Sequence, residues 1–212
     1  PRNGATTSLG DWMIAPSKLP NGIRPLINLA HNNGMKFGIW IEPEMVNTTS
    51  ELYEKHPDWV LRHPDFEPTY GRGKTQLLLD LTNPKVQDHV FKVVDDLMTQ
   101  YPDIYYIKWD NNMSMSNTHS QYLPAELQSN LYVDFTLALE KILKRIRAKY
   151  PDVVIQLCAS GGGRLNYGFM PYFQEMWTSD QTDASHRILI QWGALNFYPS
   201  NMLAAHVGSA DS

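Results

Sequence analysis

Residues 105–114 read YYIKWDNNMS, an apolar run that ends in Lys108, Trp109 and Asp110 before two asparagines. Apolar runs without polar alternation are typical of strands buried in a parallel sheet. Residues of functional types also close other apolar runs, at 40–44, 158–164, 179–180 and 206. Because the βα loops of a β/α barrel converge on one mouth, polar groups at the ends of successive strands favour that fold. We therefore predict a (β/α)8 TIM-type barrel.

The competing fold is a doubly wound sheet, which the same order of elements permits. Such a sheet, when it binds nucleotides, carries a glycine-rich turn after its first strand. The run SGGG at 160–163 follows a late strand and matches neither GxGxxG nor the phosphate-binding GxxxxGK pattern. The barrel is the better interpretation.

Apolar runs and helical periodicity alternate along the whole chain. We predict strands at 35–41, 76–81, 104–109, 153–158, 175–179 and 202–207. We predict helices from residue 23 to a C-cap at Gly34, and over 50–56, 83–101, 124–150 and 183–195. This alternation indicates one domain over 1–212, with a parallel sheet that helices cover on both faces.

The composition excludes several classes of protein. The 212 residues are 42% apolar, enough for one sizeable core, and the net charge of −4 gives no electrostatic reason to bind nucleic acid or an anionic membrane. No apolar run approaches the ~20 residues that cross a bilayer. The single cysteine, Cys158, excludes an internal disulfide and a cysteine-rich zinc site, and it fits a reducing compartment such as the cytoplasm.

Asp110 and Asp180 are the candidate catalytic residues. Each follows an apolar run within three residues of a tryptophan. Two carboxylates that face each other across a mouth can divide the roles of nucleophile and acid, as glycoside hydrolysis requires. Lys108 would hold Asp110 ionised, and indole faces suit the apolar faces of a pyranose. The alternative is that Asp110 caps a loop and the tryptophans belong to the core.

Other residues allow two interpretations each. Asp183 competes with Asp180 as the acid, unless it caps the next helix. Glu42 and Glu44 are candidate metal ligands, but we expect them to form ion pairs that fix the strand before them. Cys158 has no histidine near it in sequence to act as a base, so we expect a buried thiol and no nucleophile.

Six motifs occur in order: GDWMIAPSKLPNGIRPLINLAHNNGMKFGIWIEPEMVN (10–47), HPDWVL (56–61), QLLLDL (76–81), YIKWDNN (106–112), LCASGGGR (157–164) and WTSDQTDA (177–184). In these motifs the chain resembles glycoside hydrolase family 36, the bacterial α-galactosidases. The resemblance implies a retaining hydrolase of terminal α-galactosides, of the melibiose and raffinose type, with no metal or organic cofactor. It implies that Asp110 is the nucleophile and Asp180 the acid/base.

The resemblance also implies which residues bind galactose: Trp40, Lys74, Lys108, Cys158 and Gly161. Lys74 stands where members often have arginine, and Asn111 and Gln181 depart from the common KWDMN and SDNTDA motifs. The chain should cover barrel strands 3 to 7, with flanking β domains outside it and a homo-oligomeric full-length protein. The alternatives are an α-N-acetylgalactosaminidase, a galactosyl transferase of the raffinose-synthase type, a metal-dependent lyase and a non-catalytic carbohydrate-binding barrel.

Overall fold

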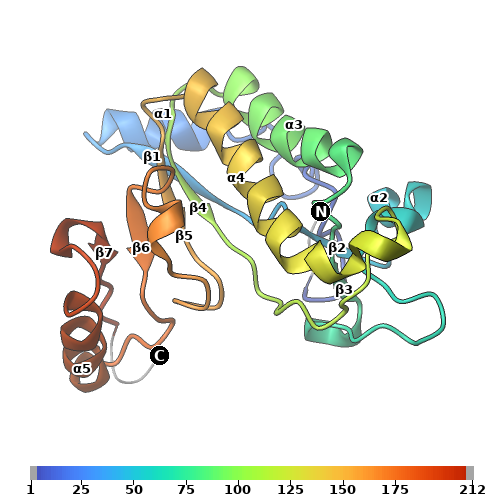
Figure 1. The fold of residues 1–212 in the computed structure, drawn as a ribbon. Coiled ribbons are helices and arrows are strands. Elements are labelled where there is room, and N and C mark those ends of the chain that lie inside the picture. The colour runs from blue at the N-terminus through green and yellow to red at the C-terminus, as the bar shows by residue number, and fades with distance from the viewer. Residues whose placement is uncertain (1–3, 209–212) are drawn as a thin grey trace.

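The computed structural model describes residues 4–208. The strands of its main sheet are all parallel. They are β1 (Phe37–Ile41), β4 (Ile104–Trp109), β5 (Val154–Leu157), β6 (Glu175–Trp177) and β7 (Leu203–Ala204). Each strand pairs with the next in this order (Figure 1). The predicted α/β architecture with a parallel sheet is therefore confirmed. The order of the described strands lacks the reversal that marks a doubly wound sheet.

The helices follow the predicted pattern closely. They are α1 (Arg24–Asn32), α2 (Glu51–Lys55), α3 (Pro84–Gln100), α4 (Leu131–Lys149) and α5 (Ala184–Leu195). The side chains of Ser50, Asn83 and Asp183 cap the N-termini of α2, α3 and α5, respectively. The predicted helix over 124–150 starts instead as a 3-10 turn, Ala125–Asn130, where the Gln128 side chain bonds the backbone of the preceding loop. None of the helices between residues 4 and 208 has the length and apolarity that crossing a membrane requires.

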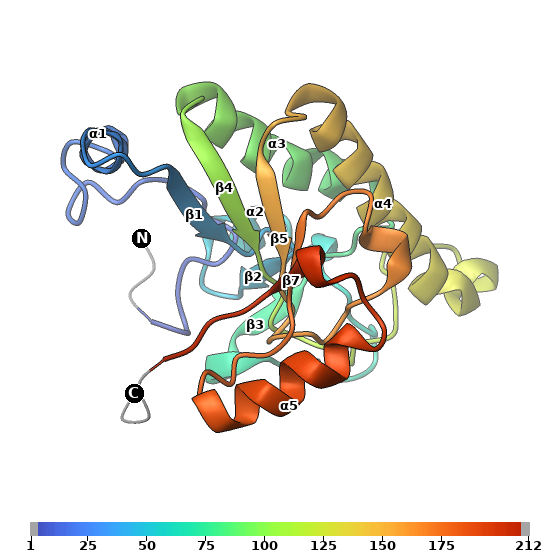
Figure 2. The ribbon, with the colours of Figure 1, turned by 90° about the vertical axis from the view of Figure 1, so that its left-hand side faces the viewer.

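The segment QLLLDL at 76–81 is not a strand of the main sheet. Its strand β3 (Gln76–Leu78) pairs antiparallel with β2 (Met45–Asn47), a strand that the sequence did not reveal. β1 pairs directly with β4, and Trp40 lies opposite Lys108, so no third strand fits between them. This two-stranded sheet lies beyond the end of β1 in both views of the ribbon (Figures 1 and 2).

The two last strands are shorter than predicted. β6 ends at Trp177, so Thr178 and Ser179 lie in the loop that follows, and His206 lies beyond β7. The Arg187 side chain from α5 bonds the backbone oxygens of Ser179 and Gln181, at 3.1 and 3.3 Å. This anchoring turns the chain out of the sheet directly after Trp177.

Helices cover one face of β1, β4 and β5, not the predicted two. α3 and α4 pack side by side on that face, and in Figure 2 the opposite face turns toward the viewer with no described helix across it. Polar side chains occupy the open face. Tyr106 and Gln156, for example, both donate hydrogen bonds to Glu175 there, at 2.7 and 3.1 Å. The sheet thus has one apolar face, covered by helices, and one polar face, where helices were expected on both faces.

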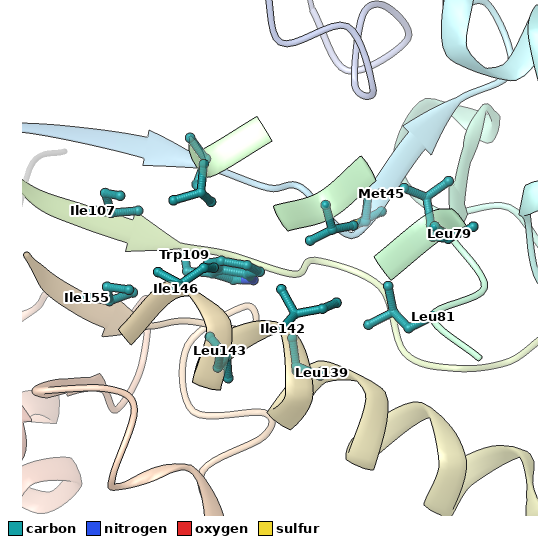
Figure 3. Packing of buried hydrophobic residues seen from close by; sticks show 14 of the residues in the cluster. Met45, Leu79, Leu81, Ile107, Trp109, Leu139, Ile142, Leu143, Ile146 and Ile155 are labelled. Carbon is teal, nitrogen blue, oxygen red and sulfur yellow. The ribbon is translucent and has the colours of Figure 1, made fainter. Parts of the chain in front are cut away.

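The helix-covered face contains the main hydrophobic core. Trp109 is fully buried, and it packs with Ile107 and Ile155 against one stripe of α4 (Figure 3). That stripe recurs at helical spacing, as Leu139, Ile142, Leu143 and Ile146. Because side chains alternate along a strand, Trp109 points into the core while Lys108 and Asp110 point to the open face. This alternation accounts for an indole between two charged residues.

Candidate active site

Asp110 lies directly after β4, where backbone bonds continue the sheet pairing past the strands. Its N–H donates to the Ile41 carbonyl, and the Cys158 N–H donates to the Trp109 carbonyl, each at 2.9 Å. The segments that follow β1, β4 and β5 are thereby held side by side. The structure thus brings together Trp40, Asp110 and Cys158, three residues that were predicted from separate motifs.

The Asp110 carboxylate is buried, with 6% of the residue exposed. Its Oδ2 accepts from Trp40 Nε1 at 3.0 Å and from Asn112 Nδ2 at 2.8 Å, and its Oδ1 accepts from the Asn111 N–H at 2.9 Å. Burial raises the pKa of Asp110, but hydrogen bonds from Trp40, Asn112 and Cys158 outweigh burial and lower it below its usual value. A buried carboxylate that stays ionised has the properties of a nucleophile.

Lys108 has a different environment from the one predicted. Its Nζ lies 4.3 Å from the centroid of the Trp177 ring, a cation–π contact that joins β4 to β6. The pKa of Asp110 is lowered mainly by hydrogen bonds from Trp40, Asn112 and Cys158. The ionised state of Asp110 therefore depends chiefly on these bonds, and not on Lys108 as predicted. Lys108 remains on the same open face, in register with Trp40 and Gln156.

Asp180 lies in the loop after β6 and is exposed. Its Oδ1 accepts a hydrogen bond from Trp177 Nε1 at 2.9 Å. Asp183 is engaged differently: its Oδ1 accepts from the N–H groups of Ser185 and His186 at the start of α5. The predicted capping role of Asp183 is therefore confirmed, which favours Asp180 as the carboxylate with freedom to act on a substrate.

The loop after β5 lies against both Asp110 and the loop that carries Asp180. Burial raises the pKa of the Cys158 thiol to about 12, so the thiol stays protonated and bonds to Asp110. Gly161 has a φ of +87°, and a Cβ built on it would lie 2.8 Å from Ser179 Cα and 3.1 Å from the Asp180 nitrogen. The loop backbone therefore lies directly against the loop that carries Asp180.

Lys74 lies in a different part of the fold from the other predicted binding residues. It belongs to the 3-10 turn Arg72–Lys74 that precedes β3 in the antiparallel sheet, and its side chain is exposed. The hydrogen bonds described for the Asp110 carboxylate come instead from Trp40, Asn112, Cys158 and the Asn111 backbone. The turn nevertheless lies near the loop after β4, because a Cβ on Gly71 would lie 3.4 Å from Met113 Sδ.

Glu44 serves as a buried anchor. It is fully buried, it accepts from Trp109 Nε1 at 2.7 Å and from Asn111 Nδ2 at 3.2 Å, and it forms an ion pair with Arg164 at 2.8 Å. The predicted ion pair is thus confirmed for Glu44. Glu42 is also buried and accepts from the backbone and side chain of Asn112.

Two residues of this site were not predicted to be functional. Asn112 contacts Asp110, and Arg164 neutralises Glu44 from 120 positions away in the chain. Their only sequence signal is membership of the motifs that contain Asp110 and Cys158. Within the described part of the chain, no three His, Cys, Asp or Glu side chains gather closely enough to hold a metal ion.

Comparison with known proteins connects this geometry to one family. The family model Melibiase matches residues 1–212. "Alpha-galactosidase 2" of Pediococcus pentosaceus is 41% identical over 97% of this chain and 28% of its own length. "Alpha-galactosidase AgaA" of Geobacillus stearothermophilus is 38% identical over 98% of this chain and 28% of its own length.

Solved structures agree with the sequence comparisons. The crystal structure of the α-galactosidase from Lactobacillus brevis matches with a TM-score of 0.94 and 41% identity, over 100% of this chain and 28% of that one. A GH36 α-galactosidase AgaA variant in complex with raffinose matches with a TM-score of 0.91 and 38% identity, over 98% of this chain and 29% of that one. The chain thus spans less than a third of the length of these relatives.

Proposed function

Because the chain belongs to the melibiase family, we propose that it carries the catalytic centre of a retaining α-galactosidase that acts on galactosides of the melibiose and raffinose type. The names of the relatives support this substrate class, as do the raffinose and stachyose complexes of AgaA variants. One observation carries the proposal: Asp110 is buried and ionised, Asp180 is exposed, and the loop after β5 contacts both Asp110, through Cys158, and the Asp180 loop, at Gly161.

In the proposed reaction Asp110 attacks the anomeric carbon of the galactose unit. Asp180 donates its proton to the glycosidic oxygen as the bond to carbon breaks, and a galactosyl ester of Asp110 forms. Asp180, now ionised, takes a proton from water, and the water oxygen displaces Asp110 from the anomeric carbon. Two inversions at one carbon give net retention, and both carboxyl groups return to their starting states.

The environments of the two aspartates suit these roles. The lowered pKa of Asp110 keeps the nucleophile ionised in the acidic range where many carboxyl groups become protonated. Asp180 has one hydrogen bond to Trp177 and solvent on its other side, so proton exchange with water is open to it. An acid that must gain and lose a proton in each turnover benefits from that access.

The remaining predicted residues are proposed to bind the sugar. Trp40 gives its indole N–H to Asp110, and its ring would contact the apolar face of the pyranose. Lys108 and the backbone at Gly161 would contact hydroxyl groups, with Cys158 packed beside them. Lys74 would have to extend from the turn before β3 to take part. The unreversed strand order supports the view that residues 1–212 form part of one β/α barrel.

Two substitutions test the roles, each in the full-length protein. Asp110→Asn should abolish hydrolysis of every α-galactoside, because a neutral amide cannot attack the anomeric carbon. A 2-fluoro galactosyl donor should label Asp110, and mass spectrometry of peptides would locate the label. Label on another carboxylate would refute the assignment.

The acid is tested by its dependence on the leaving group. Asp180→Ala should slow cleavage of melibiose by about 10²–10⁴-fold, the contribution of a positioned acid, but should slow formation of the galactosyl ester from a nitrophenyl galactoside far less. Azide should rescue the second step, since it needs no base. Asp183→Ala is the matched control, and it should lower the melting temperature without either effect. The reverse pattern would assign the acid to Asp183.

A further inference from the structure

We propose that Asn112 is a positioning residue that holds the Asp110 carboxylate for attack, and that Glu42 acts on Asp110 through the Asn112 amide. The inference rests on the proposed function, because it assigns a task to a neighbour of the nucleophile. Neither Asn112 nor Glu42 was predicted to take part in the reaction.

The Asn112 side chain bridges two buried carboxylates. Its Nδ2 lies 2.8 Å from Asp110 Oδ2 and 2.8 Å from Glu42 Oε1. The backbone N–H of Asn112 donates to the same Glu42 oxygen at 2.6 Å, and its Oδ1 accepts from Ser160 Oγ at 2.9 Å. One short side chain is thereby held by three loops, those that follow β1, β4 and β5.

The chemistry of the partners determines which way the amide points. An ionised carboxylate only accepts hydrogen bonds, so the NH2 group, the only part of the amide that donates, faces Asp110 and Glu42. The Ser160 hydroxyl donates, so it suits the amide oxygen. Both Nδ2 hydrogens and the Oδ1 atom have partners, which leaves the side chain no equivalent second orientation. The Asp110 oxygen that it contacts is correspondingly restrained.

The same arrangement sets the charge on the nucleophile. Among residues 4–208, the charged and titratable groups near Asp110 include Glu42 from the segment after β1, Cys158 after β5, and Lys108 on its own strand. The Asn112 hydrogen bond favours the ionised form of Asp110, whereas a second carboxylate at the same amide disfavours it. Removal of Asn112 and removal of the Glu42 charge should therefore shift the ionisation of Asp110 in opposite directions.

The experiment measures kcat/KM against pH on a nitrophenyl α-galactoside, with the full-length protein. The acid limb of that profile reports the ionisation of the nucleophile in the free enzyme. Asn112→Ala should move the acid limb up by about one pH unit, the effect of a lost hydrogen bond to a charged group, and should slow labelling by a 2-fluoro galactosyl donor about 10-fold or more. Glu42→Gln keeps an acceptor for both Asn112 donors but removes the charge, so it should move the acid limb to lower pH.

Asn111→Ala is the matched control. The Asn111 side chain belongs to an adjacent, more deeply buried residue and bonds to Glu44, and the backbone N–H of residue 111 would still donate to Asp110 after the substitution. It should lower the melting temperature and leave the acid limb in place. If Asn112→Ala does not fold, the isosteric Asn112→Asp replaces it, and its acid limb should also rise because a carboxyl group would face Asp110.

The outcomes separate this inference from the proposed function. An active wild-type enzyme whose acid limb is the same in the Asn112 variants, or is shifted equally by Asn111→Ala, refutes the positioning role alone. A rise of the acid limb in Glu42→Gln refutes the action of Glu42 through the amide. A wild-type protein that neither hydrolyses α-galactosides nor takes up the label refutes the proposed function itself.

Discussion

Gly161→Ala tests whether the loop after β5 sets the position of the acid. At a φ of +87°, alanine is strained, and the conformation alone should cost about 1–2 kcal/mol of stability. The added Cβ would meet only backbone: Ser179 Cα at 2.8 Å, the Asp180 nitrogen at 3.1 Å and the Ser179 carbonyl carbon at 3.3 Å. No side-chain rotation relieves such a contact, so one of the two loops must move.

The size of that movement gives the expected loss of activity. Carbon atoms in good contact lie about 3.5–4.0 Å apart, so the Asp180 loop should retreat by roughly half an ångström or more. A displacement of about 1 Å near the chemistry can cost 10²-fold in rate, so we expect kcat/KM on melibiose to fall about 10-fold. A nitrophenyl galactoside should be affected less, because its leaving group departs without a proton.

The assay compares the two substrates in wild type and in Gly161→Ala, with melting temperatures measured beside them. Gly34→Ala is the matched control, because Gly34 has a φ of +69° and no described heavy atom lies within 4 Å of a Cβ built there. It should reproduce the loss of stability and leave both rates unchanged. If Gly161→Ala slows both substrates equally, the loop does not act through the acid, and the reasoning from the Asp180 contact is wrong.

Two further predictions concern buried groups. Burial raises the pKa of Cys158 to about 12, so iodoacetamide at pH 8 should leave the thiol of the native protein unmodified for hours. In denaturant the same reagent should alkylate it quickly, and mass spectrometry would show the difference. Rapid alkylation of the native protein would contradict a buried, protonated thiol. Arg164→Ala leaves Glu44 buried with hydrogen bonds but no countercharge, and should lower the free energy of unfolding by about 3–5 kcal/mol in urea titrations. Lys92→Ala, which breaks an exposed pair with Asp96, should have a much smaller effect; equal losses would show that the Arg164 pair is not special.

Local sequence determined the elements whose signals lie within one stretch of chain. Strand β4 spans the predicted residues 104–109, and Pro84 and Asp183 stand at the predicted helix starts. These features depend on side-chain periodicity and on capping between near neighbours, which a single sequence displays directly. The motifs also identified Asp110, Cys158 and Gly161, and these three residues lie on adjoining segments of the fold.

Tertiary structure alone decided how distant segments meet. The QLLLDL segment is as apolar as a strand of the main sheet, yet it pairs antiparallel with β2, because β1 and β4 satisfy each other's backbone groups directly. Asn112 and Glu42 are 70 residues apart, and nothing local shows that a 2.6 Å hydrogen bond joins them. Such contacts follow from which strands become neighbours, and that choice is made by burial of the whole core and by pairing of every backbone group at once.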